Sequence, residues 1–111
     1  MSIKRVLAQA AVTDLERAIQ WYSNLFDSKP DSRPMEGLVE WRLGESFGVQ
    51  LWSAPDRAGQ STIVLEETDL DLLAGHLDDV GLERPEIEKV TASRLLQLED
   101  PDGNQVVVTG V

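Results

Sequence analysis

The stretch Thr13-Asp14-Leu15-Glu16 returns later in the chain as Thr68-Asp69-Leu70-Asp71, at an offset of 55 residues (68 − 13). Three further matches share this offset: Lys29-Pro30 with Arg84-Pro85, Gly48 with Gly103, and Gln50 with Gln105. Repetition in a single register is the sequence signature of duplicated supersecondary units. The chain is therefore predicted to contain two copies of one unit, each covering about half of its length.

Each copy of the motif predicts the start of a helix. A Thr at the N-cap can accept a hydrogen bond from a backbone N–H of the first turn, and Glu16 or Asp71 can reach back to the N–H of the capping residue. An acid in the first turn also lies near the positive end of the helix dipole. Because each motif follows a strand-like run, each copy is expected to begin with a strand and a helix.

Length and charge limit the class of protein. The 111 residues suffice for one domain with a shared core but not for two independent domains. The net charge of −10 disfavours nucleic acid and anionic membranes as partners, and the lack of cysteine excludes disulfides and thiolate chemistry. No apolar run reaches the length of a signal sequence or a membrane span. We therefore expect a cytoplasmic protein.

The first copy, module one, is expected to cover residues 1 to about 54. Its predicted elements are a strand at 3–12, a helix at 14–26, a short edge strand at 31–36 and strands at 38–43 and 49–53. Alternate residues of the first strand, from Val6 to Val12, form an apolar face suited to lie beneath the helix. Pro30 prevents the helix from continuing. A turn-rich linker at about 55–60 follows.

The second copy, module two, is expected to cover residues 61–111. Its predicted elements are a helix at 69–80 and strands at 62–67, 86–90, 94–99 and 105–109. Asp100-Pro101-Asp102-Gly103-Asn104 predicts a tight turn, because Pro, Asp and Gly each suit a turn position. Two helices cannot cover both sides of eight strands. The predicted fold class is therefore α+β, with two βαβββ modules in a curved mixed sheet, or half-barrel, that carries the helices on its outer face and leaves an open cleft inside.

Three stretches of the chain resemble one known family. They are Val12–Ala18 followed by Trp21-Tyr22, then Glu66–Asp71, then Asp100–Asn104. In this order they resemble the strand-to-helix junctions and the most recognisable turn of the vicinal oxygen chelate superfamily, which includes glyoxalase I, extradiol dioxygenases and bleomycin-resistance proteins. That family is built from paired βαβββ modules. One departure is Asp27, where the family usually has a helix-ending glycine, and Asp tolerates the left-handed conformation needed there.

The resemblance also implies where a metal ion would be bound. The metal enzymes of the family hold their ion on the first and last strands of the two modules, at positions that correspond here to Leu7, Trp52, Thr62 and Val107. The offset of 55 relates the first pair of these positions to the second. Two aliphatic side chains, an indole and a hydroxyl do not supply the O and N donors that a divalent ion needs. We therefore expect neither a metal nor another cofactor.

The cleft is expected to bind a ligand through aromatic and polar side chains. Trp52 shares the predicted cleft side with Gln50 and is a candidate for stacking on a ligand. The side of Trp41 is undecided, because both faces of its strand are mixed, and packing is the alternative role for both indoles. The full predicted ligand-binding set is Leu7, Gln9, Trp41, Gln50, Trp52, Thr62, Val64, Glu66, Gln105 and Val107.

Catalytic groups are sparse. Glu66 faces the cleft by alternation and could bind a cation or act as a base, or it could lie at the wet rim of the sheet. His76, the only histidine, lies in the middle of the second predicted helix, where a surface or boundary role is expected. We find no Gly-rich phosphate loop and no nucleophile–His pair. No residue is assigned as catalytic, and Glu66 is the single candidate.

Three functions are compared. The first is a glyoxalase/bleomycin-resistance-like protein that binds or sequesters a small planar, neutral or cationic molecule without metal or catalysis. The second is a metal-free enzyme with Glu66 as base, which would show a pH-dependent rate that is lost on Glu66→Gln. The third is a metal-dependent lyase or dioxygenase, against which the four implied metal positions argue. Open sheet edges together with the resemblance imply a homodimer.

Overall fold

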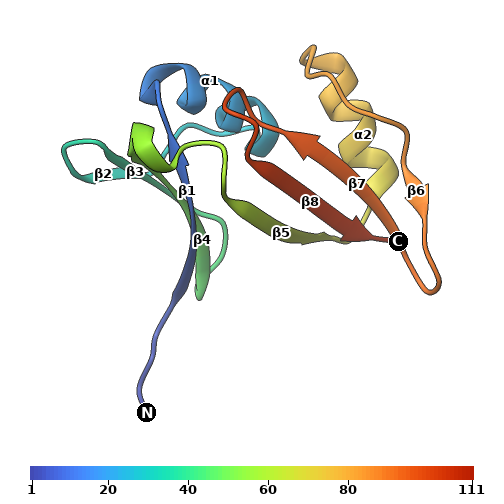
Figure 1. Ribbon diagram of the computed structural model, residues 1–111. Coiled ribbons are helices and arrows are strands. Elements are labelled where there is room, and N and C mark those ends of the chain that lie inside the picture. Colours follow the sequence, from blue (N-terminus) through green and yellow to red (C-terminus); the bar gives the residue numbers. More distant parts are fainter.

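The two predicted modules each fold into a four-stranded sheet with one helix (Figure 1). The computed structural model describes residues 1–111. Module one contains β1 (Val6–Val12), α1 (Leu15–Phe26), β2 (Ser32–Met35), β3 (Leu38–Arg42) and β4 (Phe47–Ser53). Module two contains β5 (Thr62–Glu67), α2 (Leu70–Asp79), β6 (Glu88–Lys89), β7 (Arg94–Glu99) and β8 (Gln105–Gly110). The short 3-10 helix η1 (Pro55–Arg57) connects them.

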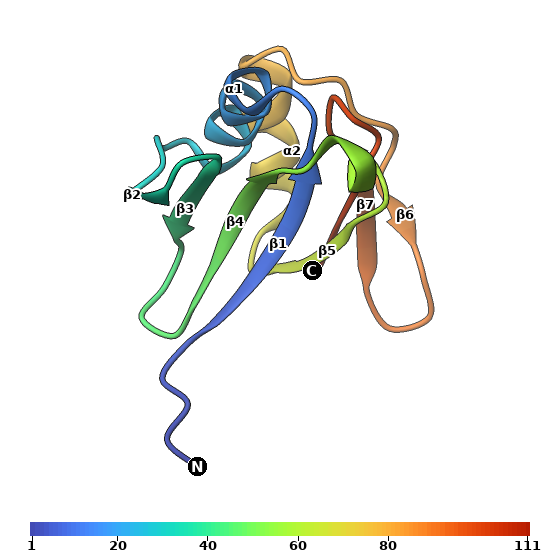
Figure 2. The same cartoon turned by 60° about the vertical axis from the view of Figure 1, so that its left-hand side comes forward.

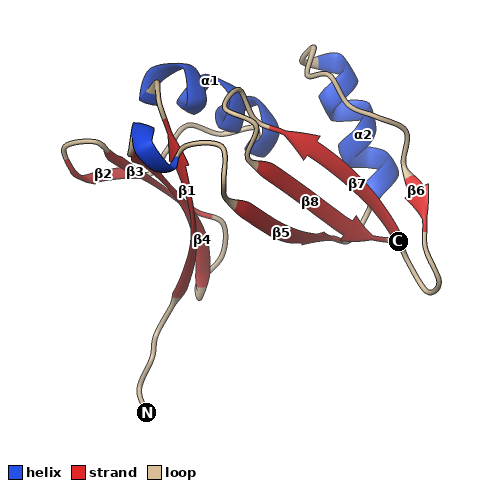
Figure 3. Cartoon of the chain, in the orientation of Figure 1, coloured by secondary structure: helices blue, strands red, loops and turns tan.

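Both sheets have the same topology, with strand orders β1-β4-β3-β2 and β5-β8-β7-β6. The first and last strands of each module run parallel, and the remaining pairs are antiparallel. The two sheets diverge from a junction near η1, and neither closes on itself (Figures 1 and 3). The predicted α+β fold of two βαβββ modules is confirmed, with two open sheets making up the half-barrel.

The strand registers show that one offset does not relate the whole of the two modules. Leu7 pairs with Gly48 in module one, and its counterpart Thr62 pairs with Gln105 in module two. Gly48 therefore corresponds to Gln105, at an offset of 57 (105 − 48). The predicted match of Gly48 with Gly103 is wrong.

The reason lies in the hairpin that precedes the last two strands. In module one, two residues separate Met35 from its partner Leu38, whereas in module two six residues separate Glu88 from Leu95, the counterpart of Leu38 at the offset of 57. The longer loop between β6 and β7 projects from the end of the sheet in Figure 1. The strands after this hairpin follow the offset of 57, so the predicted match between the glutamines of β4 and β8 is also wrong. The first strand and the helix keep the offset of 55.

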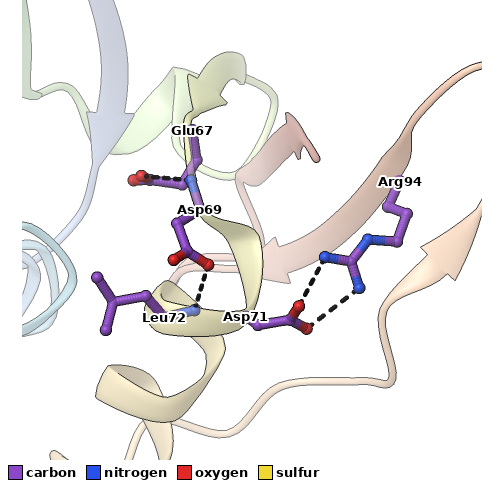
Figure 4. A network of polar contacts seen from close by, with 5 residues as sticks. All are labelled: Glu67, Asp69, Asp71, Leu72 and Arg94. Carbon is purple, nitrogen blue, oxygen red and sulfur yellow. Dashed lines mark hydrogen bonds and ion pairs between the residues drawn. The ribbon is translucent and has the colours of Figure 1, made fainter.

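Aspartates, not the threonines before them, cap the two helices. Asp14 and Asp69 each accept a hydrogen bond from the backbone N–H three residues on, at 3.1 and 3.0 Å. Asp71 does not reach back to the cap. Its carboxylate instead accepts two hydrogen bonds from Arg94 of β7, at 3.1 and 2.9 Å, and these bonds hold the pKa of Asp71 below its ordinary value (Figure 4).

The two modules share one apolar core. The helices lie next to each other above the sheets (Figure 2), and His76 Nε2 of α2 donates a hydrogen bond to the carbonyl oxygen of Asn24 in α1 at 2.6 Å. The buried cluster consists of Ala10, Val12, Ala18, Tyr22, Leu25, Val39, Trp41, Val49, Leu51, Ile63, Leu70, Leu77, Leu96, Leu98, Val106 and Val108. Since both modules contribute to it, burial of apolar surface couples their folding.

A buried polar cluster fastens the β7–β8 turn of module two to module one. The side chain of Asn104 accepts a hydrogen bond from Ser61 N and donates to the carbonyl oxygen of Ala11 and to Asp100, all at 2.8 Å. Tyr22 of α1 donates its hydroxyl to Asp100 at 2.8 Å. Burial, followed by the nearby Asp100 carboxylate, raises the pKa of Tyr22, which keeps this donor neutral.

The same turn explains what Thr13 does in place of capping. Its hydroxyl donates to Asp102 at 2.6 Å, and its backbone N–H donates to the same carboxylate at 3.2 Å. Arg17 adds a hydrogen bond to the carbonyl oxygen of Pro101 at 3.3 Å. The first repeat motif is therefore held by the last turn of the chain.

Candidate functional site

The first candidate surface is the face of the module-one sheet that points away from the helices. Alternation along β1 sends Ala10 and Val12 into the core and Leu7 and Gln9 to the opposite face. On β4, Gln50 and Trp52 share that opposite face, since Gln9 pairs with Gln50 and Ala11 with Trp52. Trp52 is half-buried there, between Ala11 and Leu38 of the neighbouring strands. The name module-one face is used below for this surface.

A chain of hydrogen bonds crosses the three strands of the module-one face. Gln9 Nε2 donates to Gln50 Oε1 at 3.0 Å, and Gln50 Nε2 donates to Glu40 Oε1 at 3.0 Å. Glu40 belongs to β3 and is the buried end of the chain, whereas Gln9 is exposed. Sequence reasoning found both glutamines but missed Glu40, because a glutamate in a strand gives no signal of burial by itself.

Two arginines lean toward Glu40 from either side. Arg5 Nη1 lies 3.7 Å and Arg42 Nε 3.8 Å from Glu40 Oε2. Gly48 pairs with Arg42 on the neighbouring strand, and a Cβ at that position would collide with the carbonyl oxygen of Trp41. Arg42 is well exposed, so the module-one face carries two guanidinium groups against one carboxylate. Sequence reasoning did not single out Arg42 as a residue of this face.

The position of Trp41 corrects one of the predicted ligand contacts. Its side chain is fully buried on the helix side of β3, beneath α1. The indole Nε1 donates to the carbonyl oxygen of Ser28 at 2.9 Å, and the ring centroid lies 5.5 Å from that of Phe26 and 6.1 Å from that of Tyr22. Trp41 is a core residue and does not face the cleft. The packing alternative therefore holds for this indole.

The remaining predicted residues lie on the corresponding face of module two. Thr62, Val64 and Glu66 of β5 are exposed, and Gln105 and Val107 of β8 are half-buried beside them. Gln105 Nε2 donates to Glu99 Oε1 at 3.1 Å. No hydrogen bond or ion pair engages the carboxylate of Glu66. This surface is called the module-two face below.

The structure thus divides the predicted site between two sheets. The sheets meet near the top of β1, where Ala11 N donates to Ser61 Oγ at 3.1 Å, and no ladder of paired strands joins β1 to β5. Leu7, Gln9, Gln50 and Trp52 are brought together on the module-one face. The residues from Thr62 onward form a second group on the module-two face.

The revised offset also changes the set of implied metal positions. Val107 corresponds to Gln50 and not to Trp52, whose counterpart is Thr109. The revised positions are Leu7, Gln50, Thr62 and Val107, where the Gln50 amide and the Thr62 hydroxyl are the only side-chain groups with donor atoms for a metal. Both ends of the Gln50 amide already make hydrogen bonds. No group of three or more His, Cys, Asp or Glu side chains is placed so that it could hold a metal ion.

An apolar hollow of about 550 Å³ opens between the modules. Its lining joins the end of α1, the β3–β4 hairpin, β5 and α2, and consists of Leu25, Phe26, Leu43, Phe47, Val64, Leu65, Glu66, Glu67, Leu73 and Val108. Glu67 accepts a hydrogen bond from Asp69 N at 3.2 Å (Figure 4). Glu66 is therefore the carboxylate at this hollow that makes no hydrogen bond or ion pair. Val64 and Glu66 are therefore the members of the predicted ligand-binding set that border this hollow, and the predicted residues of the module-one face do not line it.

Comparison with solved structures shows which fold this is. A glyoxalase/bleomycin resistance protein from Catenulispora acidiphila superposes with a TM-score of 0.90 at 28% identity, covering 97% of this chain and 98% of that one. TnmS3, an antibiotic binding protein from Streptomyces sp. CB03234, gives 0.82 at 21% identity, covering 99% and 98%. A bleomycin resistance determinant encoded on the transposon Tn5 gives 0.80 at 16% identity, covering 96% of both chains.

No sequence-family model matches the chain, and no curated protein does. No helix combines the length and the apolar character that a membrane crossing requires. The structural likeness spans nearly the whole length of each chain compared. It confirms the resemblance drawn from the repeat motifs and the final turn: the chain has the glyoxalase/bleomycin-resistance fold, consistent with the vicinal oxygen chelate superfamily.

Proposed function

We propose that the protein binds or sequesters a small planar molecule, neutral or cationic, and does so without a metal ion. The observation that carries this proposal is Trp52, a half-buried indole on the module-one face, next to the glutamine pair Gln50 and Gln9. An indole flanked by the small or apolar side chains of Ala11 and Leu38 offers a flat surface on which an aromatic ring can stack. The amides beside it would orient the ligand.

The chemistry of the four implied metal positions supports the metal-free part of the proposal. Leu7 and Val107 offer no donor atoms, Thr62 offers a neutral hydroxyl, and Gln50 is engaged by its neighbours. A divalent ion is usually held by several His or carboxylate side chains. Two similar structures are described as an antibiotic binding protein and a bleomycin resistance determinant, which is consistent with a role in binding rather than catalysis.

Charge favours cations on one face only. The module-two face carries Glu66 and Glu99, and the net charge of −10 adds a long-range attraction that salt screens beyond about 10 Å. On the module-one face, however, Arg42 is exposed and adds positive charge near the glutamine pair. The preference for neutral or cationic ligands therefore depends on contacts with the module-two side.

Fluorescence titration tests the proposal directly. A panel of planar cationic, neutral and anionic compounds should quench tryptophan emission with micromolar affinity for the first two classes. Because Trp21 and Trp41 also emit, Trp52→Phe provides the matched control and should reduce the quenching and weaken binding. Tighter binding of anions would refute the charge preference, and unchanged binding by Trp52→Phe and Trp52→Ala would refute the site.

A metal-free enzyme is the second candidate, because the free carboxylate of Glu66 lies at the border of the apolar hollow. An activity whose pH-dependent rate disappears in Glu66→Gln, with binding retained, would favour it over simple sequestration. Glu67→Gln is the matched control, since that carboxylate already accepts a hydrogen bond from the start of α2. Loss of activity in both variants would count against a specific base.

A homodimer is the proposed assembly. Three large apolar side chains remain more than half exposed near the opening between the sheets, namely Val6 (68%), Phe47 (54%) and Val64 (64%). Such exposure is typical of surfaces that are covered in an assembly. A mass measured by light scattering at tens of micromolar should be twice that of the chain, and a monomer at every concentration would refute the assembly.

A further inference from the structure

The least expected group on the module-one face is the carboxylate of Glu40. Only 8% of its side chain is exposed, although the sheet face around it is open to solvent. Burying a charge is costly unless the charge is paired and hydrogen-bonded. The two arginine nitrogens lie at 3.7 and 3.8 Å, within ion-pair distance but too far for a hydrogen bond. The close partner of Glu40 is therefore the amide of Gln50 at 3.0 Å.

The charge on Glu40 determines which way both glutamine amides point. An ionised carboxylate can only accept hydrogen bonds, so Gln50 must turn its NH2 group toward Glu40. The carbonyl oxygen of Gln50 then faces Gln9, and Gln9 must in turn offer its NH2 group. The O and N ends of an amide are normally interchangeable in a structure, but an acceptor at one end of the chain removes that freedom. The last atom in the row is Gln9 Oε1, exposed and without a protein donor.

We propose that Glu40 is a positioning residue that makes the module-one face present a hydrogen-bond acceptor, Gln9 Oε1, beside the ring of Trp52. The inference rests on the proposed function and specifies its ligand class: a planar molecule with an N–H or O–H donor at its edge. Gln50 and Trp52 are two residues apart on one strand, so the rows they occupy are separated by about 7 Å. A fused ring system stacked on the indole spans this distance and reaches the exposed amide with its edge.

Module two shows that the fold does not need the hydrogen-bonded row formed by Gln9, Gln50 and Glu40. The positions equivalent to Gln9, Gln50 and Glu40 are Val64, Val107 and Gln97. Two valines and an exposed glutamine, which donates a hydrogen bond to Glu88 at 3.3 Å, therefore occupy the corresponding places in an equally well-formed sheet. Because packing is satisfied without a buried carboxylate there, the charge on Glu40 is not required to build the sheet. The physical role that we assign to this charge is therefore to orient the amides of Gln50 and Gln9.

The test is the substitution Glu40→Gln, which replaces an obligate acceptor by a group that can donate or accept. The probes are carbazole and dibenzofuran, planar tricycles of the same shape that differ in an N–H donor and an ether oxygen. The native protein should bind carbazole about tenfold more tightly, as one net hydrogen bond predicts. In Glu40→Gln the ratio should fall to near one, with dibenzofuran binding unchanged or stronger.

A matched control uses the other module. Gln97→Glu places a carboxylate at the position equivalent to Glu40, where Val107 offers no amide to orient, so the ratio of affinities should stay at its native value. If Glu40→Gln folds poorly, Gln50→Met breaks the same chain while keeping Glu40. It should lower the ratio in the same way. A ratio that Glu40→Gln and Gln50→Met leave unchanged, or equal native affinities for both probes, would overturn the inference.

A measurement without ligand separates this inference from the proposed function. In the native protein the side-chain NH2 protons of Gln50 and Gln9 should both be shifted by their hydrogen bonds in 15N-resolved NMR spectra, and in Glu40→Gln both pairs should move. If neither tricycle binds, the ligand class fails together with the proposed site, whereas the NMR shifts still decide whether Glu40 orients the amides. If the chemical shifts of the Gln9 NH2 protons do not change in Glu40→Gln, the proposal that Glu40 orients the two amides is refuted even if ligands bind.

Discussion

Asn104 gives the most stringent test of how the two modules are joined. Its fully buried side chain makes three hydrogen bonds of 2.8 Å, to Ser61 N, to the carbonyl oxygen of Ala11 and to Asp100. Asn104→Ala leaves the part-buried N–H of Ser61 and the buried carbonyl oxygen of Ala11 without their partner and removes one donor from the buried carboxylate of Asp100. Each orphaned polar group costs about 1–3 kcal/mol. With some rescue by water, the free energy of unfolding should fall by about 3–5 kcal/mol.

A loss of that size is a large fraction of the roughly 5–15 kcal/mol that stabilises a typical domain. Urea unfolding followed by tryptophan fluorescence and far-UV circular dichroism measures it, and the midpoint temperature should fall by roughly 12 °C or more. The control is Gln20→Ala, which truncates an exposed amide on α1 and should change stability by less than about 0.5 kcal/mol. A loss below about 1 kcal/mol in Asn104→Ala would refute the assignment of this residue as the fastening between modules.

Asn104→Asp sharpens the test, because it keeps the shape and changes only the chemistry. The new carboxyl can still accept from Ser61 N, but when ionised it faces the carboxylate of Asp100 and offers no donor to Ala11. Burial and the like charge should raise the folded-state pKa of the new group, so its penalty is full above that pKa and shrinks as the pH falls through it. The gap in stability between native protein and variant should therefore narrow in acid. A pH-independent gap would contradict the proposed contacts.

Three further substitutions test other parts of the structure. Gly48→Ala should destabilise by about 1–3 kcal/mol in urea unfolding, because its Cβ meets the carbonyl oxygen of Trp41, whereas Gly75→Ala, in open space on α2, should be neutral or stabilising. Trp41→Phe should lose about 2 kcal/mol with the indole hydrogen bond to Ser28 while leaving ligand binding intact, the opposite of Trp52→Phe. Arg94→Ala should return the pKa of Asp71 to its ordinary value in an NMR titration. Because the pair is exposed, the free energy of unfolding should change little, and the small loss should be seen only above the ordinary pKa of Asp71.

The order of the elements was predictable because each one carries a local signal. Alternation marked the strands, aspartates and threonines marked both helix starts, and Asp27 adopts the left-handed conformation expected where α1 ends. The capping residue was misassigned because the alternative partner of Thr13, Asp102, lies 89 residues away in sequence. The offset failed after the second hairpin for a similar reason. A longer hairpin changes no local pattern on either side of it, and only the pairing of strands shows it.

The candidate site was predictable where one face of a strand is plainly polar or aromatic. Gln50 and Trp52 lie on the open face, as their alternation with the buried Val49 and Leu51 indicates. In β3, by contrast, four consecutive residues from Leu38 to Trp41 are buried, so alternation gives no information about sides. This strand holds both the misplaced Trp41 and the missed carboxylate beside it. In a strand whose residues are buried on both faces, the sequence pattern does not distinguish a functional side chain from the side chains that pack in the core.

The divergence of the two modules at equivalent positions suggests how recognition is divided between them. A polar row in which every hydrogen bond has a fixed direction specifies which atoms of a ligand are accepted, because a mismatched edge leaves a buried partner unsatisfied. An apolar pair such as Val64 and Val107 of module two favours contact area and tolerates many shapes. Under the proposed function, directional recognition would belong to module one, where Gln50 donates to Glu40, and the acidic module-two face would supply attraction without orientation. A duplicated fold can separate these two tasks because each sheet keeps its core face while its outer face changes independently.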